Sequence, residues 1–184
     1  MTKTRMLARI SALFLLLTLL LGACGGPKEM LGVGDSAPSS LALSDQHGQQ
    51  RTLGEFRGQG LVVYFYPKNN TPGCTAEACA FRDVWGRFEQ AQITVIGVST
   101  DDAQAHAAFA EEHELPFTLL ADTDAKLLKA FGAKPRLGFA PRISFLIDEE
   151  GVIQATYPKV DPGVHASEIL DDAARLGIGA PEQL

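Results

Sequence analysis

The stretch Leu61–Asp83, L-V-V-Y-F-Y-P-K-N-N-T-P-G-C-T-A-E-A-C-A-F-R-D, decides the fold of this 184-residue chain. Its first six residues are apolar or aromatic, of the kind that fills a buried strand. Pro67 ends that strand, because proline cannot donate a hydrogen bond to a central ladder. A turn follows, and Thr71 and Pro72 suit the N-cap and first position of a helix. The stretch therefore predicts a buried strand that leads through a turn into a helix.

Cys74 falls at the third position of the predicted helix, close to its unpaired N–H groups and the positive end of its dipole. A helix N-terminus stabilises a thiolate over a thiol, and the thiolate is the nucleophilic form. Cys79 follows five residues later, which on a regular helix turns it about 140° away and separates the two Cα atoms by roughly 8.7 Å. A disulfide requires less than about 7 Å. The two cysteines can therefore bond only if the first helical turns unwind, which indicates a working thiol pair rather than a static crosslink.

Length and composition favour one domain of ordinary size with additional terminal segments. Hydrophobic residues make up 46% of the chain, which is enough to bury a full core without a structural disulfide. The formal net charge is −6, and it becomes −9 when the three basic residues among the first 23 are set aside. An acidic body without a basic cluster argues against nucleic-acid binding.

The first 23 residues have the pattern of a secretion signal. Three basic residues precede an apolar run at residues 12–21, which is shorter than the ~20 residues that a membrane-spanning helix needs. The next segment, Leu21-Gly22-Ala23-Cys24, resembles the bacterial lipobox, which implies cleavage before Cys24 and a lipid on its sulfur. We therefore expect a signal peptide over residues 1–23, a lipid-anchored flexible tether over residues 24–33, and an extracytoplasmic, membrane-anchored bacterial lipoprotein, on the periplasmic side in a Gram-negative cell. The alternative is a plain signal peptide that happens to contain a cysteine.

Predicted strands and helices alternate through the remaining domain, residues 34–184. Further strands are expected at residues 41–43, 50–53, 93–98, 117–120, 143–147 and 152–157, and further helices at residues 103–113, 125–131 and 166–176. The helix that begins at Pro72 is expected to reach about Gln90. Because strands alternate with helices early and a hairpin comes late, we expect an α/β fold: a mixed central sheet with helices on both faces.

The segment Pro67-x-x-x-Thr71-x-x-Cys74 resembles the active-site motif of peroxiredoxins. Its form T-P-G-C-T-A-E-A-C, with a second cysteine five residues on, is similar to the Q subfamily, the bacterioferritin-comigratory type. Residues 141–148, P-R-I-S-F-L-I-D, resemble the later strand of that family, which carries its active-site arginine. The resemblance extends from about Gly34 to the C-terminus. Two features depart from the commoner pattern, namely the lipobox and a short loop at residues 134–140.

The resemblance implies a thioredoxin-like fold and the reduction of hydrogen peroxide and alkyl hydroperoxides, without a cofactor or a metal. Cys74 would be the peroxidatic cysteine that becomes a sulfenic acid, and Cys79 the resolving cysteine that joins it in an intramolecular disulfide. Thr71 and Arg142 would donate hydrogen bonds to the thiolate or the peroxide, and Pro67 would shield the site. A thioredoxin-like or other dithiol donor would then reduce the disulfide. We expect the protein to be a monomer.

Hydrogen-bond donors around Cys74 should contribute more to the rate of peroxide reduction than ionisation of its thiol does. A free cysteine is already a few per cent thiolate at neutral pH, so complete ionisation can raise its rate only about 30-fold. Fast peroxide reduction must therefore depend mainly on donors aimed at the charge that develops on the leaving oxygen. The candidates are Thr71, Arg142 and the backbone N–H groups of Gly73 and Cys74.

Other candidate residues have ordinary interpretations. Glu77 is interpreted as a helix-start acid that favours the dipole, with a catalytic role left open. The four histidines stand in polar contexts and are expected to be solvated: His47, His106, His113 and His165.

Two other functions use the same fold. A copper chaperone usually has C-x-x-x-C and a histidine as third ligand, whereas this chain has C-x-x-x-x-C and no histidine in a comparable segment. A thiol-disulfide oxidoreductase of the thioredoxin type would prefer C-x-x-C, which is absent. The motif spacing thus favours the peroxidase over both alternatives.

Overall fold

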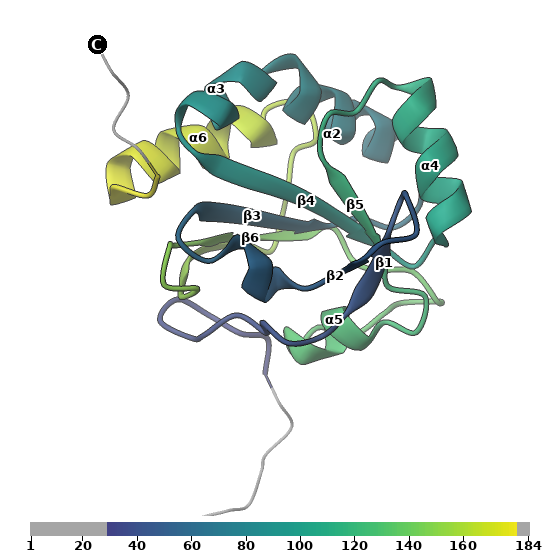
Figure 1. Ribbon diagram of the computed structural model, residues 1–184, viewed down its shortest axis with the longest axis horizontal. Coiled ribbons are helices and arrows are strands. Elements are labelled where there is room, and N and C mark those ends of the chain that lie inside the picture. The colour runs from purple at the N-terminus through teal and green to yellow at the C-terminus, as the bar shows by residue number, and fades with distance from the viewer. Residues whose placement is uncertain (1–28, 180–184) are drawn as a thin grey trace, which may run out of the picture.

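The computed structural model describes residues 29–179, which form one mixed sheet covered by helices on both faces (Figure 1). The strands are β1 (Leu43–Asp45), β2 (Gln50–Arg51), β3 (Gly60–Phe65), β4 (Ile93–Ser99), β5 (Thr118–Ala121), β6 (Ile143–Ile147) and β7 (Ile153–Tyr157). The helices are α2 (Pro72–Asp83), α3 (Trp85–Gln90), α4 (Ala103–Glu112), α5 (Lys126–Ala130) and α6 (His165–Leu176), together with the 3-10 helix η1 (Leu53–Phe56). The expected α/β architecture is confirmed.

The seven strands are ordered β2-β1-β5-β4-β3-β6-β7, so that β3 lies inside the sheet. It pairs in parallel with β4 and antiparallel with β6. Alternate β3 side chains point to opposite faces. Val62 and Tyr64 join the core under α2, α3, α4 and α6, while Val63 and Phe65 join the core that α5 covers. The continuous apolar run is therefore explained by burial on both faces.

The helix predicted to run from Pro72 to about Gln90 is interrupted. Val84 has φ −111° and ψ 17°, which ends α2 and precedes α3. Phe81 before the break and Phe88 after it are both fully buried, with ring centroids 5.6 Å apart. Phe81 and Phe88 thus join the same core cluster from two consecutive helices.

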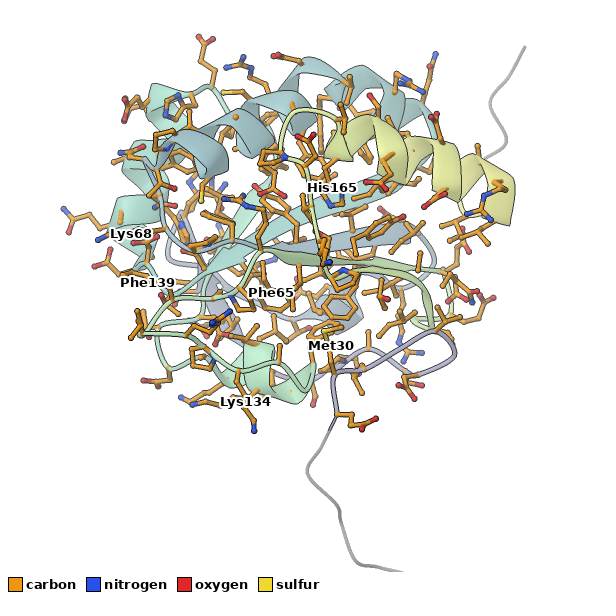
Figure 2. The ribbon with its side chains drawn as sticks, turned by 180° about the vertical axis from the view of Figure 1, so that it is seen from behind. Met30, Phe65, Lys68, Lys134, Phe139 and His165 are labelled. Atoms are coloured by element: carbon orange, nitrogen blue, oxygen red, sulfur yellow. The ribbon has the colours of Figure 1, made fainter. Side chains whose placement is uncertain are left out.

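The expectation that all four histidines are solvated is wrong for two of them. His106 and His165 have no exposed surface. Both nitrogens of each ring have polar partners, which removes the penalty of burying a polar group. His165 lies between α6 and the sheet (Figure 2), with its Nε2 2.8 Å from the Oγ of Ser144. The polar residues next to these histidines in the sequence did not reveal the hydrogen-bond partners, most of which are distant in the sequence.

The signal peptide, Cys24 and the first part of the predicted tether lie outside the described residues. The last part of the tether contacts the domain, because the N–H of Leu31 donates to the carbonyl of Phe131 at 2.9 Å. Among residues 29–179, no helix has the length and apolar character needed to cross a membrane.

Candidate active site

Cys74 lies in the first turn of α2, and its side chain is almost completely buried. Thr71 is the N-cap and Pro72 the first helical residue, as the sequence predicts. Asn70 has a φ of 56°, which turns the chain sharply from β3 into the helix. The strand, turn and helix thus place the sulfur beside the N-terminal end of α2, where unpaired N–H groups favour a negative charge.

Arg142 approaches this sulfur from the segment that precedes β6. Its Nη2 lies 3.2 Å from the Sγ of Cys74, and its Nη1 donates to the Oε2 of Glu77. A side chain at position 73 would bring a Cβ to 3.2 Å from the same Nη2, so Gly73 leaves room for the guanidinium. The structure therefore brings together the nucleophile and the arginine, which are 68 residues apart in sequence.

Glu77 was interpreted as a helix-start acid, and the structure corrects this interpretation. Its side chain is fully buried, because it is three residues after Cys74 and shares the inward face of α2. Burial raises its pKa to about 7, while the positive charge and hydrogen bond of Arg142 act in the opposite direction. Its Oε1 has no hydrogen-bond partner among the described residues. Glu77 is thus a buried partner of Arg142, a relation that the chain pattern alone does not show.

Thr71 and Pro67 belong to the segment that leads from β3 into α2. The hydroxyl of Thr71 donates to the carbonyl of Lys68 at 3.1 Å and forms no side-chain cap bond to α2. The hydroxyl proton is therefore directed to the turn in this arrangement, and the hydroxyl must reorient before it can donate to sulfur or peroxide. Pro67 is half-buried at the end of β3.

Cys79 is half-buried, and both described cysteines are free thiols. The two belong to one uninterrupted helix, α2. Regular helix geometry then separates their Cα atoms by roughly 8.7 Å, beyond the reach of a disulfide. The structure is therefore that of the wound, reduced arrangement.

The loop at residues 134–140 contacts the turn between β3 and α2. Its Arg136 and Phe139 exchange backbone hydrogen bonds of 2.8 and 3.0 Å, and Leu137 at the tip is 97% exposed. Lys68 lies beside Phe139 (Figure 2), with its Nζ 5.8 Å from the ring centroid. Because Lys68 also accepts the bond from Thr71, the loop contacts the turn that precedes the cysteine.

The described residues contain no group of three or more His, Cys, Asp or Glu side chains arranged to hold a metal ion. The cysteine, guanidinium and carboxylate instead form a compact polar group at the edge of the core, where Arg142 is partly exposed. Such a group can stabilise a thiolate and donate hydrogen bonds to an oxygen that gains negative charge.

Comparison with known proteins identifies the family. Residues 33–156 match the AhpC/TSA family. The putative peroxiredoxin bcp of Coxiella burnetii is 43% identical over 145 residues, which are 75% of this chain and 95% of that protein. The chloroplastic peroxiredoxin Q of Populus jackii is 44% identical over 137 residues, 73% of this chain and 64% of the plant protein. The chain therefore belongs to the AhpC/TSA family, and within it to the peroxiredoxins of the Q/bcp type.

Solved structures agree with this assignment. A mutant of Xylella fastidiosa PrxQ covers 80% of this chain and 98% of its own, with a TM-score of 0.76 and 32% identity. Peroxidoxin BcpB of Mycobacterium tuberculosis covers 77% and 95%, with a TM-score of 0.71 and 32% identity. The expected thioredoxin-like fold is thereby confirmed.

Proposed function

We propose that this peroxiredoxin reduces hydroperoxides through Cys74. The observation that carries the proposal is the Arg142 guanidinium, 3.2 Å from the sulfur at the start of α2. The thiolate attacks one peroxide oxygen, the O–O bond breaks, and the sulfur becomes a sulfenic acid. The departing oxygen takes the electron pair and then a proton, and it leaves as water or an alcohol.

Arg142 serves both charged species in this step. Its guanidinium donates to the thiolate before attack, and it remains a donor to the oxygen on which charge develops. Glu77 orients it through the second nitrogen. The backbone N–H groups of Gly73 and Cys74 are further donors at the helix start, and Thr71 supplies a hydroxyl after rotation.

Cys79 completes the cycle by resolution. Its thiol attacks the sulfenic sulfur of Cys74, which forms the disulfide and releases water. The first turns of α2 must unwind for this step, because the wound helix holds the two residues too far apart. A thioredoxin-like dithiol then reduces the disulfide by exchange.

The test is peroxide turnover by the purified protein with several dithiol donors in parallel. We expect one equivalent of peroxide to give a disulfide that peptide mass mapping assigns to Cys74 and Cys79 of one chain. A disulfide between two chains, or oxidation confined to other residues, would refute the mechanism. Copper titration of the reduced protein separates the peroxidase from a copper chaperone, since only the latter requires tight copper binding.

We also propose that the mature protein begins at a lipidated Cys24 and works as a monomer on the outer side of the cytoplasmic membrane or beyond. The support is the sequence Leu21-Gly22-Ala23-Cys24 after a short apolar run. Metabolic labelling with a radioactive fatty acid should mark the wild type and not Cys24→Ser. Recovery of an unlabelled soluble protein that keeps residues 1–23 would contradict the proposal. Sedimentation of the detergent-solubilised protein tests the monomer.

A further inference from the structure

A buried group of hydrogen bonds lies behind the turn between β3 and α2. The hydroxyl of Tyr66 donates to the Oδ1 of Asn69 at 2.8 Å, and the Nδ2 of Asn69 lies 3.2 Å from the Nδ1 of His106 on α4. The Nε2 of His106 lies 3.1 Å from the carbonyl oxygen of Leu120 on β5. Asn69 is only 8% exposed, although it belongs to a turn. The peroxidase mechanism above makes no use of these residues.

The chemistry of the partners gives one consistent set of bond directions, although the hydroxyl of Tyr66 also lies 3.3 Å from the Nδ1 of His106. A carbonyl oxygen only accepts, so the Nε2 of His106 carries a proton. Burial lowers the pKa of His106, with Asp101 acting in the opposite direction, so the ring is neutral and its Nδ1 accepts. The amide nitrogen of Asn69 then donates to that Nδ1, while its oxygen accepts from Tyr66. This assignment satisfies every member, which is what a buried polar network requires.

The backbone of Asn69 is held as well. Its N–H donates at 2.8 Å to the Oδ2 of Asp101, which also accepts from the hydroxyl of Ser99 at 2.8 Å. Among residues 67–71 as the structure describes them, Thr71 bonds to α2, which it caps, and Asn69 alone forms hydrogen bonds to elements other than α2. The turn is thus fixed at one residue, two positions before the N-cap Thr71 and five before Cys74.

We propose that Asn69 is a positioning residue for the peroxide step, anchored by His106 and Asp101, so that Cys74 faces Arg142 at the observed distance. The inference rests on the proposed function of Cys74. The anchor precedes the segment that must unwind, so it persists while Cys74 moves toward Cys79. It therefore acts on the attack of the thiolate and leaves resolution unchanged.

The first test compares Asn69→Ala with the wild type in single turnovers. Stopped-flow kinetics follow the oxidation of Cys74, and acid quenching with mass spectrometry follows the appearance of the disulfide. We expect oxidation to slow about tenfold, since a displacement of the nucleophile weakens its alignment with the guanidinium. Disulfide formation should stay within about twofold of the wild type. His113→Gln is the matched control, because this half-exposed histidine at the end of α4 lies outside the network.

Two outcomes would overturn the inference. One is an unchanged oxidation rate in Asn69→Ala. The other is slower oxidation together with disulfide formation accelerated by the same factor, because Asn69 would then only hold the helix wound. Failure of the wild type itself to form the disulfide between Cys74 and Cys79 would instead refute the proposed function.

The second test uses variants of His106 to distinguish loss of its bond to Asn69 from a general loss of stability. His106→Asn places an amide oxygen near the former Nδ1 and can still accept from Asn69, although it loses the bond to Leu120. His106→Gln keeps a donor for the Leu120 carbonyl but loses the acceptor for Asn69. We expect the oxidation rate of His106→Asn to stay within about threefold of the wild type and that of His106→Gln to fall about tenfold. Equal rates in variants of equal melting temperature would contradict a role through Asn69.

Discussion

Strand β3 and helix α2 follow one another in the chain, yet they are held in different ways. Each of the six residues of β3 is buried, and the strand bonds to β4 on one side and β6 on the other. Only four of the twelve residues of α2 are buried, and its backbone bonds are within the helix itself. The strand is therefore part of a frame that opens only with the whole domain, whereas the helix can open locally.

The active site is divided between these two parts. Arg142 belongs to the segment that enters β6 in the frame, while Cys74 and Glu77 belong to the helix. In the proposed cycle, unwinding α2 would remove the nucleophile from the guanidinium without disturbing the sheet. The site for peroxide and the arrangement for resolution would then be two states of one helix against a fixed sheet.

The largest expected effect is on the nucleophile. Cys74→Ser should abolish peroxide reduction, because a serine hydroxyl stays un-ionised at neutral pH and no sulfenic acid can form. The measurement is peroxide consumption under single-turnover conditions. Cys79→Ser serves as the comparison, since it should consume one equivalent and then stop as a sulfenic acid. A Cys74→Ser protein that keeps a tenth of the wild-type rate would exclude the assignment.

The second prediction concerns Arg142, the part of the active site that belongs to the segment before β6. Arg142→Ala should slow the oxidation of Cys74 by roughly 10²–10³-fold, the usual loss when a donor to a developing oxyanion is removed. Arg136→Ala is the matched control, because it removes an exposed arginine of the same loop region whose side chain has no hydrogen bond among the described residues. Stopped-flow oxidation rates and melting temperatures give the result. A structural arginine would instead lower stability and activity together.

Amide hydrogen exchange tests directly whether α2 opens while β3 stays closed. On oxidation by one equivalent of peroxide, exchange should rise roughly a hundredfold across residues 71–82, since the helical bonds there must open. Residues 61–65 of β3 should keep their protection in both redox states. Protection that stays complete through Cys79 in the oxidised protein would show that the helix does not unwind.

The sequence predicted only part of this arrangement of β3, α2 and the active-site residues. The six-residue apolar run and the Thr71-Pro72 start predicted β3 and the beginning of α2, because local propensity and burial agree there, whereas the break at Val84 was not predicted. The contact of Arg142 with Cys74 followed from resemblance to a family, since no local pattern spans 68 residues. The burial of Glu77, His106 and Asn69 could not be predicted, because their partners come from other elements and determine whether a polar side chain can leave water.

Substitution of Glu77 should have a smaller effect, and its effect on the free energy of unfolding should depend on pH. Its pKa is raised from 4.5 to about 7 in the folded protein, so the folded state holds a proton that the unfolded state has lost between these values. Stability from this group is complete below pH 4.5 and is lost as the pH rises through about 7. Glu77→Gln should therefore gain on the order of 1–3 kcal/mol of unfolding free energy over the wild type at pH 8 and none below pH 4.5.

The same variant should slow oxidation of Cys74 about tenfold at pH 8, because Arg142 loses its anionic partner. Denaturant unfolding at several pH values and stopped-flow rates measure the two effects. Glu89→Gln, at an exposed position of α3, is the control and should change neither. A Glu77→Gln protein that is less stable at pH 8 would show that the ion pair outweighs the cost of burying the carboxylate.

The smallest effect concerns the ease of unwinding itself. Ala76 is exposed in the interior of α2, so Ala76→Gly changes helix propensity with little change in packing. Glycine lowers helix stability by about 0.5–1 kcal/mol, which should speed disulfide formation about two- to fivefold and leave oxidation of Cys74 nearly unchanged. Ala108→Gly makes the same change at an exposed position of α4, a helix that stays wound. Both variants should lose similar stability, but only the first should resolve faster. Equal rates of disulfide formation in the two variants would mean that unwinding α2 does not limit this step. The difference in burial between β3 and α2 would then have no consequence for resolution.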